Sequence, residues 1–133
     1  MTLLAIRLQA ETPSRPLRVL IVDDQLLYAE ALSVLLGQER GLEVVGIAGD
    51  GREALAAAAE LQPDVVLMDI EMPLLDGISA TRLLRERLPA TKVVVMTALT
   101  GDEHEARALG AGASACVRKF SPAGDLLEAI ETA

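Results

Sequence analysis

Short apolar runs alternate with segments of helical periodicity from residue 17 onwards. The runs are rich in Val, Ile and Leu and have the length of strands, whereas the segments between them repeat apolar residues three and four positions apart. The pattern predicts five strands, at 17–22, 43–48, 65–68, 92–97 and 114–118. It predicts a helix after each strand, at 26–36, 50–61, 78–88, 102–109 and 122–130.

Residues typical of helix ends support these boundaries. Asp50 and Glu53 have the spacing of a capping box, in which side chains accept hydrogen bonds from N–H groups of the first turn. Asp76 can cap the third helix, and Ser121 before Pro122 is typical of the cap and first turn of the last helix. In the first helix, the spacing places four apolar residues on one face: Leu27, Ala31, Val34 and Leu35.

This alternation predicts an α/β fold of the (βα)5 type. Strands joined by helices run parallel, and a parallel sheet is covered by helices on both faces. Uninterrupted apolar strands such as 19–22 and 93–96 fit burial on both sides. In doubly wound sheets of this kind, ligands bind in a crevice outside the carboxyl ends of the strands. The residues at those ends therefore decide the function.

The composition fits one globular domain and argues against binding to nucleic acid. The chain has 133 residues, 51% of them hydrophobic, which is enough to bury a core and too apolar for disorder. Its 20 acidic and 12 basic residues give a net charge of −8, whereas binding to phosphate backbones needs clustered positive charge. Pro13 and Pro16 interrupt the start of the chain, so we expect a flexible tail over 1–16 and a domain over 17–133.

The single cysteine and the single histidine narrow the chemistry further. Cys116 cannot form a disulfide within the chain, and with His104 it offers too few ligands for a zinc site. A metal ion would therefore bind to carboxylates, which favours Mg²⁺ or Ca²⁺. The lone cysteine is typical of a cytoplasmic protein, and no apolar run approaches the roughly 20 residues of a membrane helix.

Charged and hydroxyl side chains stand at the carboxyl ends of four predicted strands. The first strand is followed by Asp23 and Asp24, the third ends at Asp69, the fourth ends at Thr97, and Lys119 follows the fifth. Each residue alone has an ordinary explanation, such as a helix cap for an aspartate or a solvated surface charge for the lysine. Their joint placement predicts that three carboxylates, a hydroxyl and an ammonium group share one crevice.

Such a crevice has the groups needed for phosphoryl transfer. Three neighbouring carboxylates repel one another, and Mg²⁺, which prefers a few carboxylates together with water and phosphate, relieves that repulsion. A carboxylate can also attack phosphorus, and the transferred group needs its oxygens neutralised. The sequence therefore indicates transfer of a phosphoryl group to Asp69, with Thr97 and Lys119 near its oxygens.

Several segments taken together resemble the receiver domain of two-component response regulators. They are Arg18-Val-Leu-Ile-Val-Asp-Asp24, Asp64-Val-Val-Leu-Met-Asp-Ile-Glu-Met-Pro73, Asp76-Gly77, Val-Val-Val-Met-Thr-Ala98 and Lys119. The resemblance covers about residues 17–133 and is greatest to receivers fused to LuxR-type helix-turn-helix domains. It implies a flavodoxin-like, doubly wound parallel sheet of five strands in the order 2-1-3-4-5.

The resemblance implies a role for each acidic residue of the crevice. Asp69 matches the phospho-acceptor. Asp24 matches the residue that contacts Mg²⁺ directly, and Asp23 the one that acts through water. The backbone carbonyl of Glu71 matches a further ligand beside Asp69, and Lys119 matches the lysine that pairs with the phosphoryl group. Mg²⁺ is thus the expected cofactor.

Other positions are implied to control switching and the lifetime of the phosphoryl group. Thr97 matches the switch hydroxyl, whereas Cys116 stands where the family commonly has an aromatic residue. Phe120 stands where the family commonly has proline after a cis peptide bond, which would cost about 3–4 kcal/mol without proline. Glu71 and Leu99 match the positions that flank the path of the hydrolytic water.

The resemblance also implies partners. The phosphoryl donor would be a phosphohistidine of a sensor histidine kinase, and the receiver would catalyse only its own phosphorylation and later hydrolysis. A homodimer could form through the face of the fourth helix, fifth strand and fifth helix, with Arg107 and Arg118 as pairing charges, or through the first and fifth helices. The output would be transcriptional, in a domain outside this chain, without contact of this chain to nucleic acid or membrane.

Three other functions remain open at this point. A stand-alone receiver or a pseudo-receiver would act through protein–protein contacts without an output domain. A phosphatase with an aspartate nucleophile usually has a second aspartate where this chain has Glu71. A flavodoxin-like binding module would need a Ser/Thr/Gly-rich first loop, and Asp23 with Asp24 would repel its phosphate.

Overall fold

The computed structural model describes residues 15–98 and 101–133. The expected tail over 1–16 falls almost wholly outside the described residues, as does Leu99. Within the described residues, strands and helices alternate as the sequence predicts, with ends that differ by at most two residues. The elements are β1 (Leu17–Val22), α2 (Leu26–Gly37), β2 (Leu42–Ala48), α3 (Gly51–Leu61), β3 (Val65–Asp69), α4 (Gly77–Arg87), β4 (Lys92–Thr97), α5 (Asp102–Gly110), β5 (Ala115–Arg118) and α6 (Ala123–Thr132).

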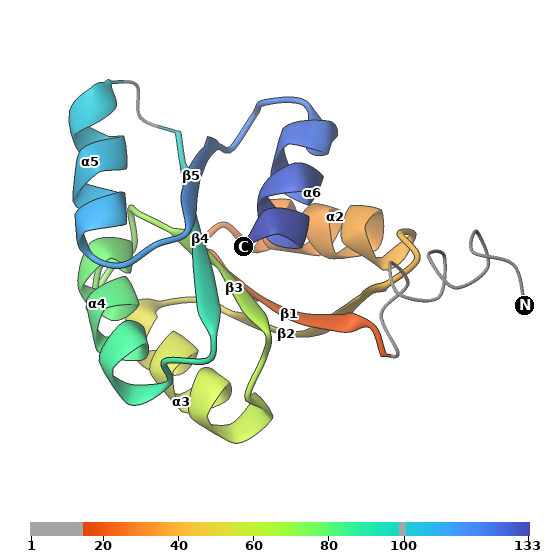
Figure 1. Ribbon diagram of the computed structural model, residues 1–133, viewed down its shortest axis with the longest axis horizontal. Coiled ribbons are helices and arrows are strands. Elements are labelled where there is room, and N and C mark those ends of the chain that lie inside the picture. The colour runs from red at the N-terminus through yellow and green to blue at the C-terminus, as the bar shows by residue number, and fades with distance from the viewer. Residues whose placement is uncertain (1–14, 99–100) are drawn as a thin grey trace, which may run out of the picture.

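The strands form one parallel sheet in the order β2-β1-β3-β4-β5, which confirms the expected flavodoxin-like topology (Figure 1). The register places the strand ends side by side. Val22 of β1 pairs with Met68 of β3, and Asp69 pairs with Met96 of β4. The residues that follow β1 are therefore direct neighbours of the last residue of β3.

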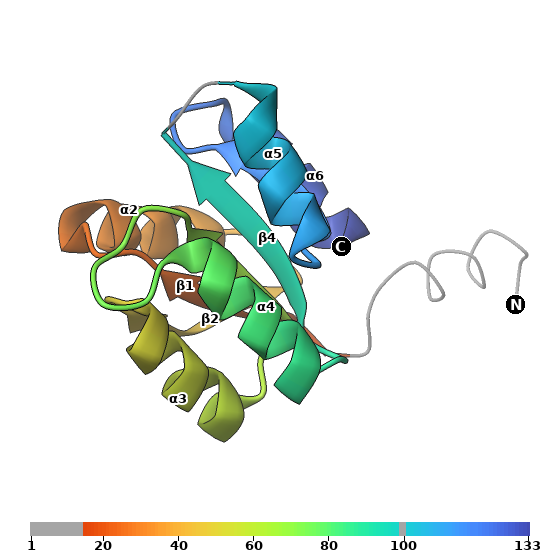
Figure 2. The same ribbon diagram turned by 90° about the vertical axis from the view of Figure 1, so that its left-hand side faces the viewer.

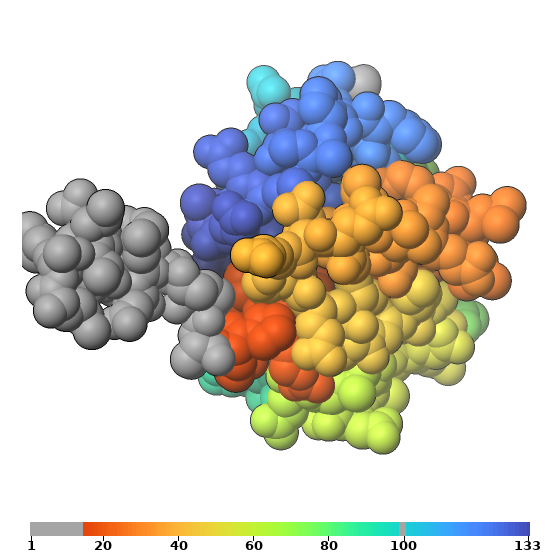
Figure 3. All heavy atoms as spheres, turned by 90° about the vertical axis from the view of Figure 1, so that its right-hand side faces the viewer, coloured from red at the N-terminus to blue at the C-terminus, as the bar shows by residue number. Residues whose placement is uncertain are grey.

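Side chains that alternate along the strands divide the core into two clusters. One cluster contains Leu20, Val66 and Val93 and packs against α3, α4 and α5. The other contains Ile21, Leu67 and Val94 and packs against α2 and α6. Figure 2 shows α4 and α5 in front of the sheet, and Figure 3 shows the opposite side, where the surfaces of α2 and α6 adjoin. The fully apolar strands are thus explained by burial on both faces.

Two of the three predicted helix caps are present. Asp50 accepts a hydrogen bond from the N–H of Glu53 at 2.9 Å, and Asp76 accepts one from the N–H of Ser79 at 2.9 Å. The prediction for Ser121 is wrong, because the cap residue of α6 is Pro122. The Ser121 hydroxyl donates instead to the carbonyl oxygen of Arg118 at 2.7 Å, so a turn after β5 occupies it.

The apolar face that helical spacing picks out on α2 is not the face that packs on the sheet. Leu27 and Val34 are 83% and 65% exposed, and Ala31 and Leu35 are exposed as well. The buried residues of the helix are Ala29, Leu32 and Leu36. Because α2 is apolar on nearly every side, spacing alone does not determine which face is buried.

Candidate functional site

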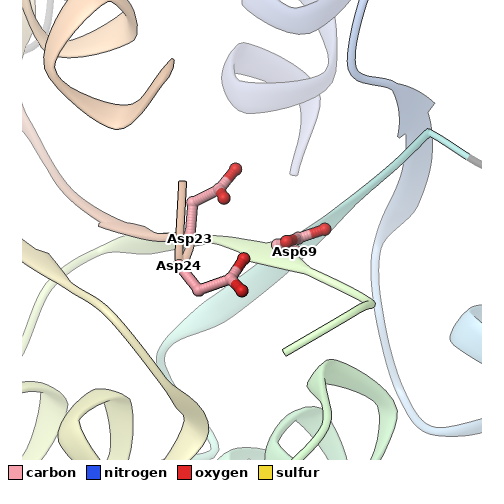
Figure 4. A group of neighbouring side chains, drawn as sticks. All are labelled: Asp23, Asp24 and Asp69. Atoms are coloured by element: carbon pink, nitrogen blue, oxygen red, sulfur yellow. The ribbon is translucent and has the colours of Figure 1, made fainter. Parts of the chain in front are cut away.

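Three carboxylates meet at the carboxyl ends of β1 and β3. Asp23 and Asp24 follow β1 and Asp69 ends β3, and one carboxylate oxygen of each lies within 4.8 Å of the others. Figure 4 shows the three side chains, with Asp23 and Asp24 on the segment after β1 and Asp69 beside them. Asp23 and Asp69 are buried and Asp24 is exposed. The cluster is therefore open to solvent on the Asp24 side.

Lys119 brings the positive charge to this cluster. Its backbone N–H donates to the carbonyl oxygen of Thr97 at 2.9 Å, which places the residue at the end of β4. Its side-chain nitrogen lies 2.6 Å from Asp23 Oδ2 and 3.6 Å from Asp69 Oδ2. It also donates to Gln25 Oε1 at 3.0 Å. Lys119 is 8% exposed, and its ammonium group thus lies between the two buried carboxylates.

The environment of Asp69 disfavours its charged form. The pKa of Asp69 is raised from 3.8 to about 6, mainly by burial and next by the charge of Asp23, while Lys119 opposes the shift. Glu71 contributes a backbone N–H that lies 3.4 Å from Asp69 Oδ1. The carboxylate cluster therefore has more negative charge than the single ammonium group compensates.

This arrangement fits a divalent cation. Lys119 forms an ion pair with Asp23 Oδ2 at 2.6 Å and so offsets part of the negative charge of the cluster. The charge that remains favours a further cation beside these oxygens. Three carboxylates around an accessible space are the donor set that Mg²⁺ prefers.

An open cavity of about 270 Å³ gives access to the carboxylates. It is lined by Asp24, Gln25, Asp69, Glu71, Ala98, Lys119 and Phe120. Glu71 is exposed at its rim. The cavity therefore connects Asp69 with solvent.

The loop between β3 and α4 turns back over Asp69. Leu74 has a φ of 69°, and Leu75 donates its N–H to the carbonyl oxygen of Pro73 at 2.8 Å, a turn of three residues. Gly77 then donates to the carbonyl oxygen of Ile70 at 3.0 Å. A Cβ at Gly77 would overlap with the carbonyl oxygen of Asp69, so this close approach requires glycine.

Thr97 and Cys116 line a second cavity, of about 140 Å³, on the α5 side of β4 and β5. Thr97 is buried and Cys116 is half-buried. Burial, followed by the charge of Glu105, raises the pKa of the Cys116 thiol, which keeps it protonated. Space is thus present beside Cys116, at the position where receivers commonly carry an aromatic ring.

Two contact residues of this site were missed by the sequence reasoning. Gln25 and Tyr28, both of the α2 region, contact Lys119, and Phe120 contacts Tyr28. The described residues contain no cis peptide bond, so the bond between Lys119 and Phe120 is trans. The sequence contains one Tyr and one Phe, and this scarcity was the available signal that Tyr28 and Phe120 have a structural role.

The five-stranded sheet of this order, with carboxylates at the ends of β1 and β3, defines a flavodoxin-like receiver fold. The sequence profile of the response regulator receiver domain matches residues 19–131. The chain is 38% identical over 114 residues to the response regulator protein VraR of Staphylococcus aureus, a match that covers 86% of this chain and 54% of that protein. The chain belongs to the response regulator receiver domain family and spans about half the length of this relative.

Solved structures support the same assignment. A two-component response regulator of the LuxR family from Aurantimonas sp. SI85-9A1 is 35% identical, with a TM-score of 0.84 over 88% of this chain and 84% of that chain. The response regulator domain of CheB from Thermotoga maritima is 37% identical, with a TM-score of 0.82 over 90% of this chain and 96% of that chain. The relatives thus include LuxR-family response regulators. Among the described residues, no helix has the length and apolar sequence needed to cross a membrane.

Proposed function

We propose that this domain accepts a phosphoryl group on Asp69 from a phosphohistidine of a sensor histidine kinase, in a reaction that depends on Mg²⁺. The observation that carries the proposal is the position of Asp69. Its carboxylate ends a buried strand, lies among Asp23, Asp24 and Lys119, and opens into a cavity that solvent reaches.

The chemistry follows from these positions. An oxygen of the Asp69 carboxylate attacks phosphorus, and the bond from phosphorus to the imidazole nitrogen breaks, leaving its electron pair on the nitrogen. The product is an aspartyl phosphate. Water later hydrolyses the bond between its phosphorus and the Asp69 oxygen. Lys119, 3.6 Å from Asp69 Oδ2, is close enough to pair with an oxygen of the transferred group. Mg²⁺, when bound, supplies the positive charge that neutralises the phosphoryl oxygens.

Four residues would hold the metal: Asp24 and Asp69 through carboxylates, Glu71 through its backbone carbonyl, and Asp23 through a water molecule. We expect Asp24→Ala to weaken Mg²⁺ binding at least about tenfold, because Asp24 would bind the ion directly and its loss leaves one carboxylate fewer in the cluster. Asp23→Ala should weaken binding less, since its role is through water.

The matched control for this series is Thr97→Ala, which changes a residue that lines the other cavity. Calorimetric titration with Mg²⁺ in the absence of phosphate would measure all three variants. Equal weakening by Thr97→Ala would contradict this division of roles.

The switch and the output complete the proposal. Thr97 would respond to the phosphoryl group, and Cys116, beside the same cavity, is too small to fill it as an aromatic ring would. Glu71 and Leu99 would tune the lifetime of the phosphoryl group. The face of α5, β5 and α6, with the exposed Arg107 and Arg118, or the pair α2 and α6, would mediate homodimerisation. Phosphorylation would control a transcriptional output domain of a cytoplasmic regulator.

Labelling by a small phosphoryl donor tests the function directly. With acetyl phosphate, the carboxylate of Asp69 displaces acetate, which leaves with the electron pair of the broken phosphorus–oxygen bond. We expect intact-mass measurement to show one phosphoryl adduct per chain, dependent on Mg²⁺, and reduction with borohydride followed by peptide mapping to place it on Asp69. An unlabelled protein, or an adduct on another residue, would overturn the proposal.

A further inference from the structure

Tyr28 holds Lys119 at both ends of the residue. The Tyr28 hydroxyl donates a hydrogen bond to the backbone carbonyl oxygen of Lys119 at 2.7 Å. The face of the same ring lies 4.6 Å from the Lys119 side-chain nitrogen, measured to the ring centroid. The two residues are 91 positions apart in the sequence, so the fold alone brings them together. One aromatic side chain thus fixes both the loop that carries the lysine and the charge at its tip.

The hydroxyl contact depends on a protonated phenol. Burial raises the pKa of Tyr28, and the charges of Asp23 and Asp69 raise it further. The phenol therefore keeps its proton at neutral pH and can donate to the Lys119 carbonyl. Asp23 and Asp69 therefore act on both residues: they raise the pKa of the Tyr28 phenol and attract the Lys119 ammonium group.

Gln25, the residue that precedes α2, adds a second contact to Lys119. It is the cap residue of the helix that carries Tyr28, and its backbone is extended. Its Oε1 accepts a hydrogen bond from the Lys119 nitrogen at 3.0 Å, and its own N–H donates to Asp23 Oδ1 at 2.8 Å. Gln25 and Tyr28, at the start of α2, therefore both contact the ammonium group.

Phe120 lies against the Tyr28 ring. The two rings meet edge to face, with centroids 5.8 Å apart and an interplanar angle of 75°. Phe120 is otherwise 78% exposed, so Tyr28 is the ring contact that the structure gives it. The peptide bond before Phe120 is trans and lacks the constraint of proline, and Tyr28 binds to the carbonyl of that same bond.

A lysine needs this kind of restraint. Its side chain has four flexible bonds and a point charge, and here the nearest anion is Asp23 rather than the acceptor Asp69. A charge held on a ring face in a site with little water gains more from the ring than an exposed one does. The contact with the ring therefore restrains the ammonium group in addition to its ion pair with Asp23.

We propose that Tyr28 is a positioning residue that holds the Lys119 ammonium group between Asp23 and Asp69, and that it acts on phosphoryl acceptance through Lys119 alone. The inference rests on the proposed function, because it assigns Tyr28 to the same reaction. Tyr28 lies outside the carboxylate cluster. Its hydroxyl donates a hydrogen bond to the carbonyl oxygen of the trans peptide bond before Phe120.

Initial rates of labelling by acetyl phosphate test this role. We expect Tyr28→Leu, which removes ring face and hydroxyl, to slow the labelling of Asp69 about tenfold. Tyr28→Phe keeps the ring and should slow it only about threefold. Ser121→Ala is the matched control, because it removes a hydroxyl that donates to the Arg118 carbonyl in the same loop, and it should label at the wild-type rate.

A double-mutant cycle shows whether the effect passes through Lys119. In a Lys119→Met background, Tyr28→Leu should cause no further slowing, since the group that it positions is gone. Full additivity in the cycle, or equal rates for Tyr28→Leu and wild type, would overturn the inference.

The chain offers a direct optical reading of the same contact. It contains one Tyr and no Trp, so tyrosine fluorescence reports on Tyr28 alone. In protein free of metal and phosphate, Lys119→Met should change this fluorescence because the charge over the ring disappears, whereas Ser121→Ala should leave it unchanged. Identical spectra for Lys119→Met and wild type would contradict the contact.

The two levels of the argument fail separately. If the wild-type protein takes up no label on Asp69, the proposed function fails and this inference fails with it. If the wild type is labelled but Tyr28 and Lys119 act additively, the proposed function stands and only the inference is overturned.

Discussion

Asp69→Asn is expected to abolish labelling by acetyl phosphate. The amide has nearly the same shape as the carboxylate but is not a nucleophile toward phosphorus at neutral pH, so the adduct should fall below detection in intact-mass measurement. Asp76→Asn is the matched control. It changes another aspartate of the same loop region, and Asn caps a helix about as well as Asp, so labelling should remain complete.

Asp69→Asn should also raise the stability of the metal-free protein against unfolding. Because the pKa of Asp69 is raised from 3.8 to about 6 in the folded state, the folded protein holds this proton more tightly than the unfolded chain does. Folding stability that involves Asp69 therefore falls as pH rises from 3.8 to about 6 and stays low above that range. A shift of this size corresponds to a loss of about 2–3 kcal/mol of folding free energy when Asp69 ionises. Asn cannot ionise, so the variant avoids this loss.

Urea unfolding without Mg²⁺ would measure this gain. Asp69→Asn should be more stable than the wild type near neutral pH and nearly equal to it at the acid end of the range. A gain of the same size at both pH values would contradict the titration of Asp69 as the cause. Labelling that persists in the variant would refute the assignment of the acceptor.

Gly77→Ala is expected to destabilise the domain by at least about 3 kcal/mol. The added Cβ would overlap with the carbonyl oxygen of Asp69 and approach the carbonyl carbon of the same residue, and both are backbone atoms that cannot swing aside. Either the helix start or the end of β3 must shift. Urea unfolding would measure the loss, and the displaced Asp69 should also slow labelling in the fraction that folds.

Gly124→Ala provides the control for this substitution. Gly124 also lies in the first turn of a helix, α6, and a Cβ there would meet nothing within 4 Å. Alanine is favoured over glycine in a helix, so this variant should be as stable as the wild type or slightly more stable. A Gly77→Ala protein with wild-type stability would show that the close approach over Asp69 is not required.

Local patterns were enough to predict the sheet and the carboxylate cluster. Strands such as β3 are apolar along their whole length because they are buried on both faces, and this makes their ends visible in the sequence. Once the strand ends are known, parallel topology brings Asp23, Asp24 and Asp69 together without further information. The helix caps at Asp50 and Asp76 were predictable for a similar reason, since each is a contact within three residues.

Features that depend on packing between distant segments were not predictable in this way. The buried face of α2 is set by the sheet beneath it, and a helix with Leu on several sides leaves that choice to tertiary structure. Ser121 has the residue type of a cap, but a turn with Arg118 takes its hydroxyl. The contact of Tyr28 with Lys119 joins residues on opposite ends of the chain, and no spacing rule connects them.

The charges of the site belong to parts of the sheet with unequal resistance to local opening. Asp23 and Asp69 are attached to β1 and β3, which have a neighbouring strand on each side, whereas Lys119 follows β5, an edge strand of four residues with β4 as its neighbour. Edge strands separate from a sheet at lower free energy than interior strands do. A transient detachment of β5 would carry the ammonium group away while the carboxylates stay together, so the charge balance at Asp69 depends on how firmly one short edge strand is held.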